Sequence, residues 1–192
     1  MIDSITGVVL AGGKSSRMGR SKALLPFKGK PLVELCLARL SEIFSRVILS
    51  VNQDDAFSHL TTERIVDRYV ETGPMGGIAS VLESGQAKIF CAACDMPFLN
   101  KSLIEYLSTF ADCDAVIPVW KGRPEVLHAI YSNTVLPSFQ SALHQSRFRI
   151  MDALMESNIR YVHEEEIRRM DPQGLSFQNV NTPADYDQLL NF

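Results

Sequence analysis

The sequence predicts an α/β protein built around a mostly parallel sheet. Short apolar runs rich in β-branched residues alternate along the chain with stretches whose apolar residues recur at helical spacing. This alternation implies right-handed strand–helix–strand crossovers and a sheet that helices cover on both faces. The chain has 192 residues, and because a domain averages roughly 150 residues, one domain is the simplest expectation.

Four apolar runs are expected to form buried strands. Each is short and dominated by aliphatic residues, which is the composition of strands buried on both faces of a sheet. The expected strands span residues 7–10, 47–51, 89–93 and 115–119.

Helices are expected between these strands and after them. Apolar residues follow helical spacing over 32–44 and over 103–110. The second of these helices is expected to start at Lys101 and Ser102. The pattern loosens after residue 121. The later part is expected to add a strand at 126–131, helices at 135–143 and 151–155, and a closing helix at 183–190. We therefore predict a single domain over 1–192, whose halves, about 1–120 and about 121–192, do not have independent cores.

Composition and charge exclude several classes of function. The chain carries 19 Lys plus Arg against 22 Asp plus Glu, a net charge of −3, whereas a non-specific nucleic-acid binder needs a basic excess. No apolar run approaches the ~20 residues that span a bilayer, and the N-terminus lacks the basic region of a signal peptide. We expect a cytoplasmic protein with no nucleic-acid or membrane partner.

The four cysteines are too few and too scattered for a disulfide framework. Cys91 and Cys94 form a CxxC pair, but the run from Ile89 to Cys94 has the pattern of a buried strand, where residues three apart point to opposite faces. We interpret all four as structural thiols: Cys36, Cys91, Cys94 and Cys113.

Polar residues and glycines follow three of the expected strands. The strand at 7–10 runs into Ala11, Gly12 and Gly13, the strand at 47–51 into Asn52, and the strand at 89–93 leads to Asp95. In parallel sheets the ligand binds beyond the carboxyl ends of the strands. The sequence therefore predicts the site at this edge.

The segment Leu10–Lys22, which reads LAGGKSSRMGRSK, is glycine-rich and carries four cations. Glycines allow backbone N–H groups to approach a ligand closely and form an anion-binding nest, so a polyphosphate is the expected guest. The Walker A pattern fails in both registers, and no dinucleotide fingerprint is present.

This segment resembles the nucleotidyltransferase signature LAGGxSxRMGxxK. Three further stretches resemble motifs of the molybdenum cofactor guanylyltransferase family (molybdopterin-guanine dinucleotide biosynthesis protein A): GPMGG at 73–77, CDMPF at 94–98 and NVNTP at 179–183. The resemblance covers nearly the whole chain, with the motifs in the family's order. It implies a three-layer, Rossmann-like nucleotidyltransferase fold, with a nucleotide-binding half followed by an acceptor-side half.

The resemblance also implies roles for individual residues. The family's nucleotide contacts correspond here to Leu10, Ala11, Gly12, Gly13, Lys22, Asn52, Asp67 and Asp95. Asp95 also corresponds to the family's Mg²⁺ ligand, and one carboxylate with triphosphate oxygens is a sufficient magnesium site. Taken alone, Asp95 could instead be a helix N-cap.

The implied reaction transfers GMP from GTP to the terminal phosphate of molybdopterin or Mo-molybdopterin and releases pyrophosphate. The attacking phosphate is already anionic, so no general base is needed, and no His lies in the four motifs. We expect Arg17, Lys22 and Asp95 to act by positioning and by neutralising charge. The four histidines are expected to be structural or surface groups, of which His128 is the least clear.

The family places the acceptor over the later half of the sheet. Candidate contacts are Gly122–Pro124 and Arg147–Arg149, because the acceptor carries a phosphate. Relatives often carry Pro where this chain has Val126, which leaves the backbone at Glu125–Leu127 open. Molybdoenzymes or their chaperones are further expected partners, as recipients of the product.

Two other kinds of function stay open from the sequence. One is a different nucleotidyltransferase of the same fold, acting with CTP on molybdopterin, or on cobinamide phosphate or a sugar phosphate. The other is a non-catalytic GTP-binding carrier of the cofactor, which would need neither Lys22 nor Asp95 for chemistry. A kinase is disfavoured by the absence of a Walker A motif.

Overall fold

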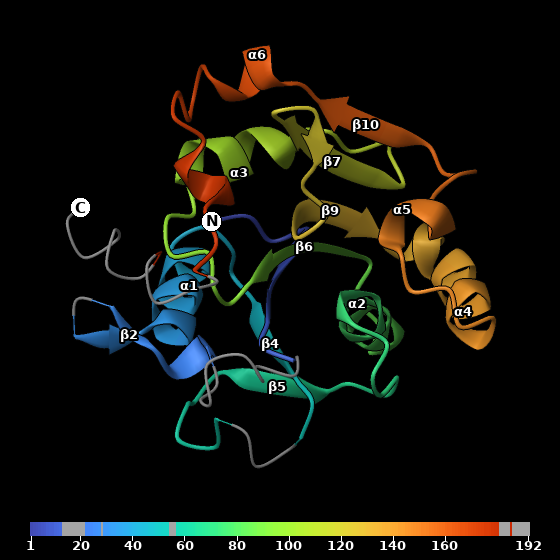
Figure 1. The fold of residues 1–192 in the computed structure, drawn as a ribbon, viewed down its shortest axis with the longest axis horizontal. Helices are drawn as coiled ribbons and strands as arrows, with labels where there is room; N and C mark the ends of the chain where they lie inside the picture. The colour runs from blue at the N-terminus through green and yellow to red at the C-terminus, as the bar shows by residue number, and fades with distance from the viewer. Residues whose placement is uncertain (13–21, 28, 54–56, 181–184, 186–192) are drawn as a thin grey trace.

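The computed structural model describes residues 1–12, 22–27, 29–53, 57–180 and 185. One curved sheet runs through the molecule with helices on both faces, as Figure 1 shows. The strands of its main path lie in the order β10-β7-β9-β6-β1-β4-β5, and β8 pairs with β7. This is the predicted α/β architecture.

The four predicted strands are confirmed within one residue at each end. They are β1 (Thr6–Leu10), β4 (Val47–Val51), β6 (Lys88–Ala93) and β7 (Ala115–Trp120). Their residues are almost all buried, as expected for strands that helices cover on both sides.

The sheet is parallel except around β9 (His128–Ser132) and β8 (Arg123–Pro124). β1 pairs in parallel with β4 and β6, while β9 runs antiparallel between β6 and β7. Because β6 and β7 are both antiparallel to β9, they point the same way, and their carboxyl ends meet one edge of the sheet. β5 (Glu63–Val66) and β10 (Ile159–Val162) close the two sides in parallel pairing.

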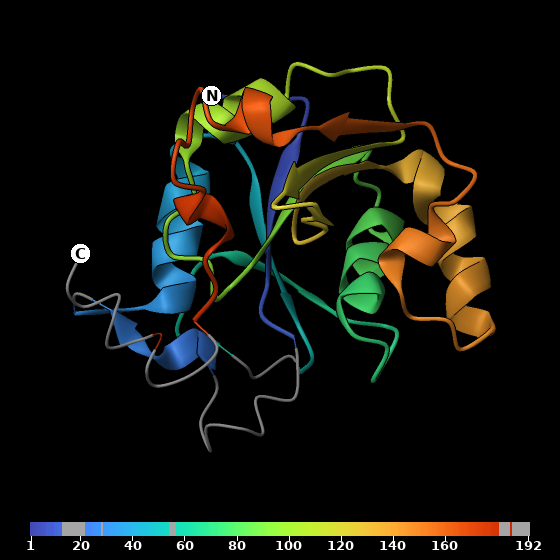
Figure 2. The same ribbon diagram turned by 45° about the horizontal axis from the view of Figure 1, so that its top comes forward.

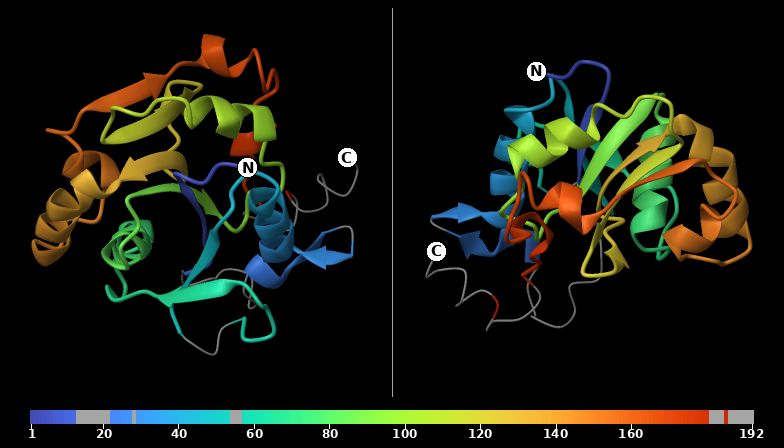
Figure 3. Two further views of the ribbon diagram at one scale, coloured as in Figure 1. Left: turned by 180° about the vertical axis from the view of Figure 1, so that it is seen from behind. Right: turned by 90° about the horizontal axis from the view of Figure 1, so that it is seen from above.

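Helices form the outer layers (Figures 1 and 2). On one face lie α1 (Leu32–Ser41) and α3 (Lys101–Leu107), and on the other α2 (Pro74–Glu83), α4 (Leu136–His144) and α5 (Ile150–Ala153). The remaining elements are short: α6 (Glu164–Ile167), the 3₁₀ turns η1 (Lys22–Leu24), η2 (Asn133–Val135) and η3 (Leu175–Phe177), and the hairpin of β2 (Pro26–Phe27) and β3 (Lys30–Pro31). The hairpin projects away from the sheet (Figure 3).

Several boundaries differ from the sequence expectation. The first helix ends at Ser41 rather than at residue 44, because Phe44 forms a bridge with Ile2. The strand expected at 126–131 starts at His128, since the preceding residues form a turn closed by the bond from the His128 N–H to the Glu125 carbonyl, 3.0 Å. The closing helix expected at 183–190 falls almost entirely outside the described residues.

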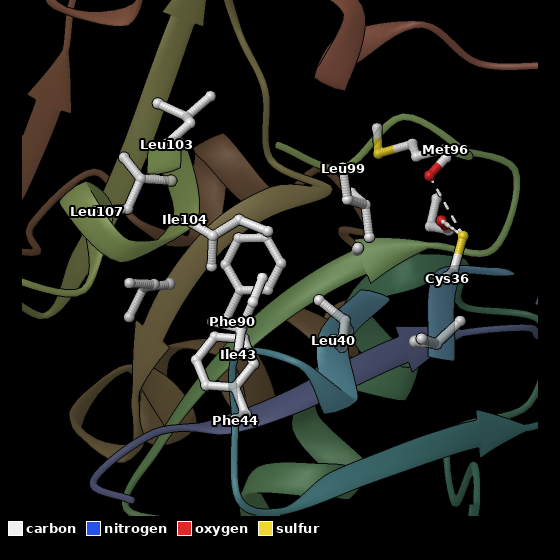
Figure 4. Close-up of a cluster of buried hydrophobic side chains, with 14 of the residues drawn as sticks. Cys36, Leu40, Ile43, Phe44, Phe90, Met96, Leu99, Leu103, Ile104 and Leu107 are labelled. Atoms are coloured by element: carbon white, nitrogen blue, oxygen red, sulfur yellow. Dashed lines mark hydrogen bonds between the residues drawn. The ribbon is translucent and has the colours of Figure 1, made fainter. Parts of the chain in front are cut away.

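Apolar side chains fill both faces of the sheet. On the α1 and α3 face, Phe44 and Phe90 stack with ring centroids 5.7 Å apart, surrounded by aliphatic residues (Figure 4). On the α2 and α4 face, one cluster joins Val8 and Ile48 to Ile117 and Tyr131. Buried contacts thus continue from the first half of the chain into the second. Within the described residues, no helix is long and apolar enough to cross a membrane.

Candidate nucleotide and acceptor sites

The carboxyl ends of the central strands are tied directly to one another. Beyond β1, the Ala11 N–H donates to the Ser50 carbonyl at 2.9 Å, and the Cys94 N–H donates to the Leu10 carbonyl at 3.1 Å. On the other side, the Asp67 N–H donates to the Val51 carbonyl at 2.8 Å. The sheet therefore holds the loops that follow β1, β4, β5 and β6 in fixed positions at one edge.

A hollow of about 520 Å³ opens at this edge. It contains three of the predicted nucleotide contacts, Gly12, Asn52 and Asp67. Its other lining residues are Gln53, Tyr69, Val70, Glu71, Thr72 and Gly73. Its volume falls in the range of sites for small molecules and cofactors.

Gly12 sits where any side chain would collide with the site. A Cβ atom there would lie 2.5 Å from Asn52 Oδ1 and 2.7 Å from Asp67 Oδ2. Gly77 is similarly restricted, since its Cβ would lie 2.7 Å from Ser50 Oγ. These glycines keep the backbone close to the polar side chains at this edge of the sheet.

Asp67 is a largely buried carboxylate. The Ser50 hydroxyl donates a hydrogen bond to its Oδ1 at 2.6 Å. Burial raises the pKa of Asp67, and the Ser50 hydrogen bond partly opposes that shift. A desolvated acceptor at the floor of the hollow is suited to receiving N–H or O–H donors from a ligand.

The GPMGG motif does not form a loop throughout. Gly73 ends the loop with a positive φ of 68°, and Pro74 begins α2. Gly76 lies in the first turn of this helix against Tyr69, whose carbonyl oxygen would be 2.8 Å from a Cβ. Helix α2 thus starts beside the hollow, with the positive end of its dipole at that edge.

Sequence reasoning missed the stretch Tyr69–Thr72 as part of this hollow. The side chain of Tyr69 is held in place by Glu83, to which its hydroxyl donates a hydrogen bond. Gln140 Nε2 donates to the same carboxylate at 2.6 Å. The stretch has no strand or helix periodicity. Its only sequence signal is its place between Asp67 and Gly73.

Asp95 lies two residues beyond β6, at the same edge of the sheet, and the Cys94 N–H before it is bonded to the Leu10 carbonyl, two residues before Gly12. It does not cap α3, because that role belongs to Asn100, whose side chain accepts from the Leu103 N–H at 3.0 Å. The Asp95 carbonyl instead accepts from the Val180 N–H at 3.0 Å. This contact joins the CDMPF and NVNTP motifs, although 85 residues separate them in the sequence.

The residues around Asp95 fit a magnesium ion held partly by substrate. Among the described residues, no group of three His, Cys, Asp or Glu side chains could hold a metal ion. Mg²⁺ binds through one or two carboxylates with waters and phosphate oxygens, so the half-exposed Asp95 fits this coordination. Such an ion would require a phosphate-bearing ligand.

Two of the predicted cation and glycine contacts fall outside the structure's description, and a third is described only in part. Gly13 and Arg17 lie outside the described residues. Lys22 begins η1, and its backbone alone is described. Leu10 ends β1 and is buried, and Ala11 continues it toward the hollow.

A second hollow, of about 410 Å³, opens farther along the sheet. Its walls are the end of β7, the β7–β8 turn and the segment around η3. The lining residues are Trp120, Lys121, Arg123, Glu125, Gln173, Gly174, Phe177 and Gln178. Of the predicted acceptor contacts, Arg123 therefore lies in this hollow, whereas Arg147 lines a different one between α4 and α5.

The turn before β9 is held firmly without a proline at position 126. The Glu125 N–H donates to the Pro118 carbonyl at 2.8 Å, and the buried Tyr131 hydroxyl donates to the Val126 carbonyl at 2.7 Å. The Ala93 N–H donates to the Leu127 carbonyl at 3.3 Å. These bonds fix the backbone that the sequence left open.

The histidines and cysteines stay outside both hollows. His59, His144 and His163 are exposed, and His128 is fully buried between Phe90 and Phe177, so the expectation of structural and surface histidines is confirmed. Burial raises the pKa of the Cys91 thiol to about 12. A thiol of this kind is inert rather than redox-active.

Comparison with known families agrees with this arrangement. Residues 7–160 match the family model of the MobA-like NTP transferase domain. The chain belongs to this family. Membership assigns the nucleotidyltransferase class of chemistry to this chain.

Named relatives cover the whole chain. A protein of Carboxydothermus hydrogenoformans named "Probable molybdenum cofactor guanylyltransferase" is 34% identical over 98% of this chain and 96% of its own length. A Methanosarcina mazei protein of the same name is 34% identical over 96% of this chain and 89% of its own.

Solved structures are similar as well. Molybdopterin-guanine dinucleotide biosynthesis protein A from Archaeoglobus fulgidus has a TM-score of 0.87 at 29% identity, covering 97% of each chain. A 2-C-methyl-D-erythritol 4-phosphate cytidylyltransferase from Thermus thermophilus has a TM-score of 0.72 at 13% identity, covering 97% of each chain. The latter shares the fold alone, so the fold does not determine which base is used.

Proposed function

We propose that this protein transfers GMP from GTP to the terminal phosphate of molybdopterin, with or without bound molybdenum, and releases pyrophosphate. The observation that carries the proposal is the arrangement along one sheet edge. In the order of the strands, Asp95 follows β6, between a hollow lined by Gly12, Asn52 and Asp67 at the ends of β1, β4 and β5 and a second hollow at the end of β7. Two substrates can therefore approach Asp95 from opposite sides.

The nucleotide is assigned to the first hollow. Backbone at Gly12 and the start of α2 offer N–H groups and a positive dipole toward phosphates. The carboxylate of Asp67 and the amide of Asn52 offer acceptors and donors to the nucleoside. Lys22 and Arg17, at the end of and within the glycine-rich segment, would hold the triphosphate.

The transfer requires in-line attack by an acceptor phosphate oxygen on the α-phosphorus of GTP. A P–O bond forms there, the bond to the bridging oxygen breaks, and pyrophosphate leaves with that electron pair. The attacking phosphate is already anionic, which agrees with the absence of histidine from the lining of both hollows. Catalysis then consists of positioning and of offsetting charge at the α-phosphate.

Mg²⁺ is the cofactor that we propose for Asp95. When bound, the ion would supply charge neutralisation between the phosphates, a contribution of several kcal/mol. Asp95 follows a buried strand and its backbone is hydrogen-bonded to Val180, so the chain presents this carboxylate from a rigid position. Lys22 and Arg17 would add positive charge to the triphosphate.

The expected setting follows from the substrates. We propose that the protein works in the cytoplasm, where GTP is available, and passes its product to molybdoenzymes or their chaperones. The carrier function is disfavoured, because binding alone does not need both Asp95 and Lys22.

A panel of nucleotides tests this function directly. Purified protein is incubated with molybdopterin, Mg²⁺ and GTP, CTP or ATP, and pyrophosphate release is measured. GTP should be used at least ~10-fold better than the others, a difference of about 1.4 kcal/mol. Equal use of CTP would indicate a cytidylyltransferase, and GTP binding without pyrophosphate release would indicate a carrier.

A further inference from the structure

The second hollow combines aromatic and acidic groups in a way that fits a flat heterocycle. Phe177 and Trp120 supply aromatic surface, with ring centroids 5.7 Å apart and planes tilted by 31°. Glu125, which also lines the hollow, supplies a carboxylate. Its volume of about 410 Å³ is enough for a bicyclic ring with one substituent.

The wall formed by Trp120 is rigid. The Arg168 guanidinium lies over the indole, 4.9 Å from the ring centroid. Gly174, with φ of 64°, packs so closely that a Cβ would lie 2.2 Å from the indole carbons. The shape of the hollow is therefore set before a ligand enters.

Glu125 is a half-buried carboxylate without a donor in the described part of the protein. Burial raises its pKa, and the nearby positive charge of Arg123 opposes that shift. No described residue donates a hydrogen bond to its side chain, and its carboxylate forms no ion pair with any of them. Its backbone, in contrast, is fixed at both the N–H and the carbonyl.

A desolvated carboxylate costs free energy unless donors satisfy it. Its two oxygens match two N–H donors that lie side by side on a planar ligand, as they do in bidentate pairs. The pterin ring of molybdopterin has such an edge, formed by the ring N3–H and the 2-amino group.

We propose that Glu125 is the specificity-determining residue for the acceptor and pairs with the N3–H and 2-amino group of its pterin ring in the second hollow. This rests on the proposed function for the identity of the acceptor. Phe177 would pack against the ring, and Glu125 would exclude rings that present a carbonyl at the 2-position.

Hydrogen bonds connect segments that line the hollow to Asp95. Gln178 lines the hollow, and two residues later the Val180 N–H donates to the Asp95 carbonyl. On the neighbouring strands, Glu125 and Asp95 each lie two residues from the bonded pair Leu127 and Ala93. A ring held by Glu125 would therefore leave the phosphate end of the acceptor free to extend toward Asp95.

The test compares two ligands that differ at one position of the ring. 6-Hydroxymethylpterin monophosphate presents the 2-amino group, and the corresponding lumazine presents a 2-oxo group in its place. Binding of each is measured by the fluorescence of the pteridine, with a non-hydrolysable GTP analogue filling the nucleotide site. Wild type should bind the pterin at least ~10-fold tighter, because the lumazine carbonyl opposes the carboxylate.

Glu125→Gln presents one acceptor and one donor, which pair equally well with the N3–H and C4 carbonyl that both rings share. The pterin-to-lumazine ratio should fall to about 1, and Glu125→Asp should retain a preference for pterin. Glu165→Gln, which removes an exposed carboxylate of α6, makes the same change in charge and should leave the ratio at the wild-type value.

An unchanged ratio in Glu125→Gln, or no binding of the pterin to wild type, would overturn the assignment. These readouts are separate from guanylyl transfer. Failure of transfer with an intact pterin preference would refute the proposed reaction and leave the pterin site standing. Transfer that proceeds with a ratio near 1 in wild type would refute the role of Glu125 alone.

Discussion

His128 should make the protein less stable in acid, and its replacement by Phe should remove this effect. The imidazole is fully buried, edge-on to Phe90 and Phe177, with centroids 5.1 Å from each. Neither ring nitrogen has a hydrogen-bond partner in the described structure. Burial lowers the pKa of His128 to about 3, and the charge of Asp171 only partly opposes the shift.

The magnitude follows from proton linkage. Below its ordinary pKa of 6.5 the unfolded His128 takes up a proton, whereas the folded one stays neutral until about pH 3. The free energy of unfolding therefore falls by about 1.4 kcal/mol for each pH unit in this window. Between about pH 7.5 and about pH 4.5 this residue alone should remove about 2.7 kcal/mol.

Urea unfolding of wild type and His128→Phe at about pH 7.5 and about pH 4.5 measures the effect. Phe has a similar shape and no unpaired nitrogens, so it should be at least as stable as wild type at the higher pH. The difference in free energy of unfolding between His128→Phe and wild type should grow by about 2–3 kcal/mol at the lower pH. His59→Gln, at an exposed position, is the control and should not change the pH dependence. A difference between wild type and His128→Phe that is equal at both pH values would refute the buried neutral state.

Three further changes probe the site and its walls. Lys22→Ala should weaken GTP binding and slow turnover at sub-saturating GTP without unfolding the protein. If the variant turned over at the wild-type rate, Lys22 would not be part of the site. Asp95→Asn should lower turnover by ~10²-fold or more, with partial recovery at high Mg²⁺ or Mn²⁺, and identical metal titration curves for mutant and wild type would mean that the metal site lies elsewhere. Gly174→Ala should lower the free energy of unfolding in urea by about 2–4 kcal/mol, because backbone strain adds to a clash with Trp120. Gly85 has a positive φ but open space around it, so Gly85→Ala, the control, should lower the free energy of unfolding by only about 1 kcal/mol. Equal losses in the two variants would contradict the close packing of Gly174 against the indole.

The strands that helices cover on both faces could be predicted from sequence, because burial on both sides requires continuous apolar runs. The edge strand β5 could not, since its residues Glu63 and Arg64 interrupt the apolar pattern of a half-exposed strand. Helix α2 was hidden for a related reason. Its first turn contains Pro74, Gly76 and Gly77, which read as a loop although Pro is favourable at the start of a helix.

The structure brings predicted site residues together where they directly follow strands. Gly12, Asn52 and Asp67 meet in one hollow because parallel strands bring their carboxyl ends to one edge. The wall at Tyr69–Thr72 and the contact between Asp95 and Val180 depend on where loops and distant segments return, which spacing along the chain does not encode. The second hollow likewise joins Glu125 to Phe177, from segments with no shared pattern.

Following the phosphorus atoms of GTP tests the central claim most directly. The protein is incubated with molybdopterin, Mg²⁺ and GTP labelled at either the α- or the γ-phosphate, and products are separated. The α-label should appear in a molybdopterin–guanine dinucleotide and the γ-label in pyrophosphate. Transfer of the γ-label to the acceptor, or retention of both labels in GTP, would contradict guanylyl transfer at this sheet edge.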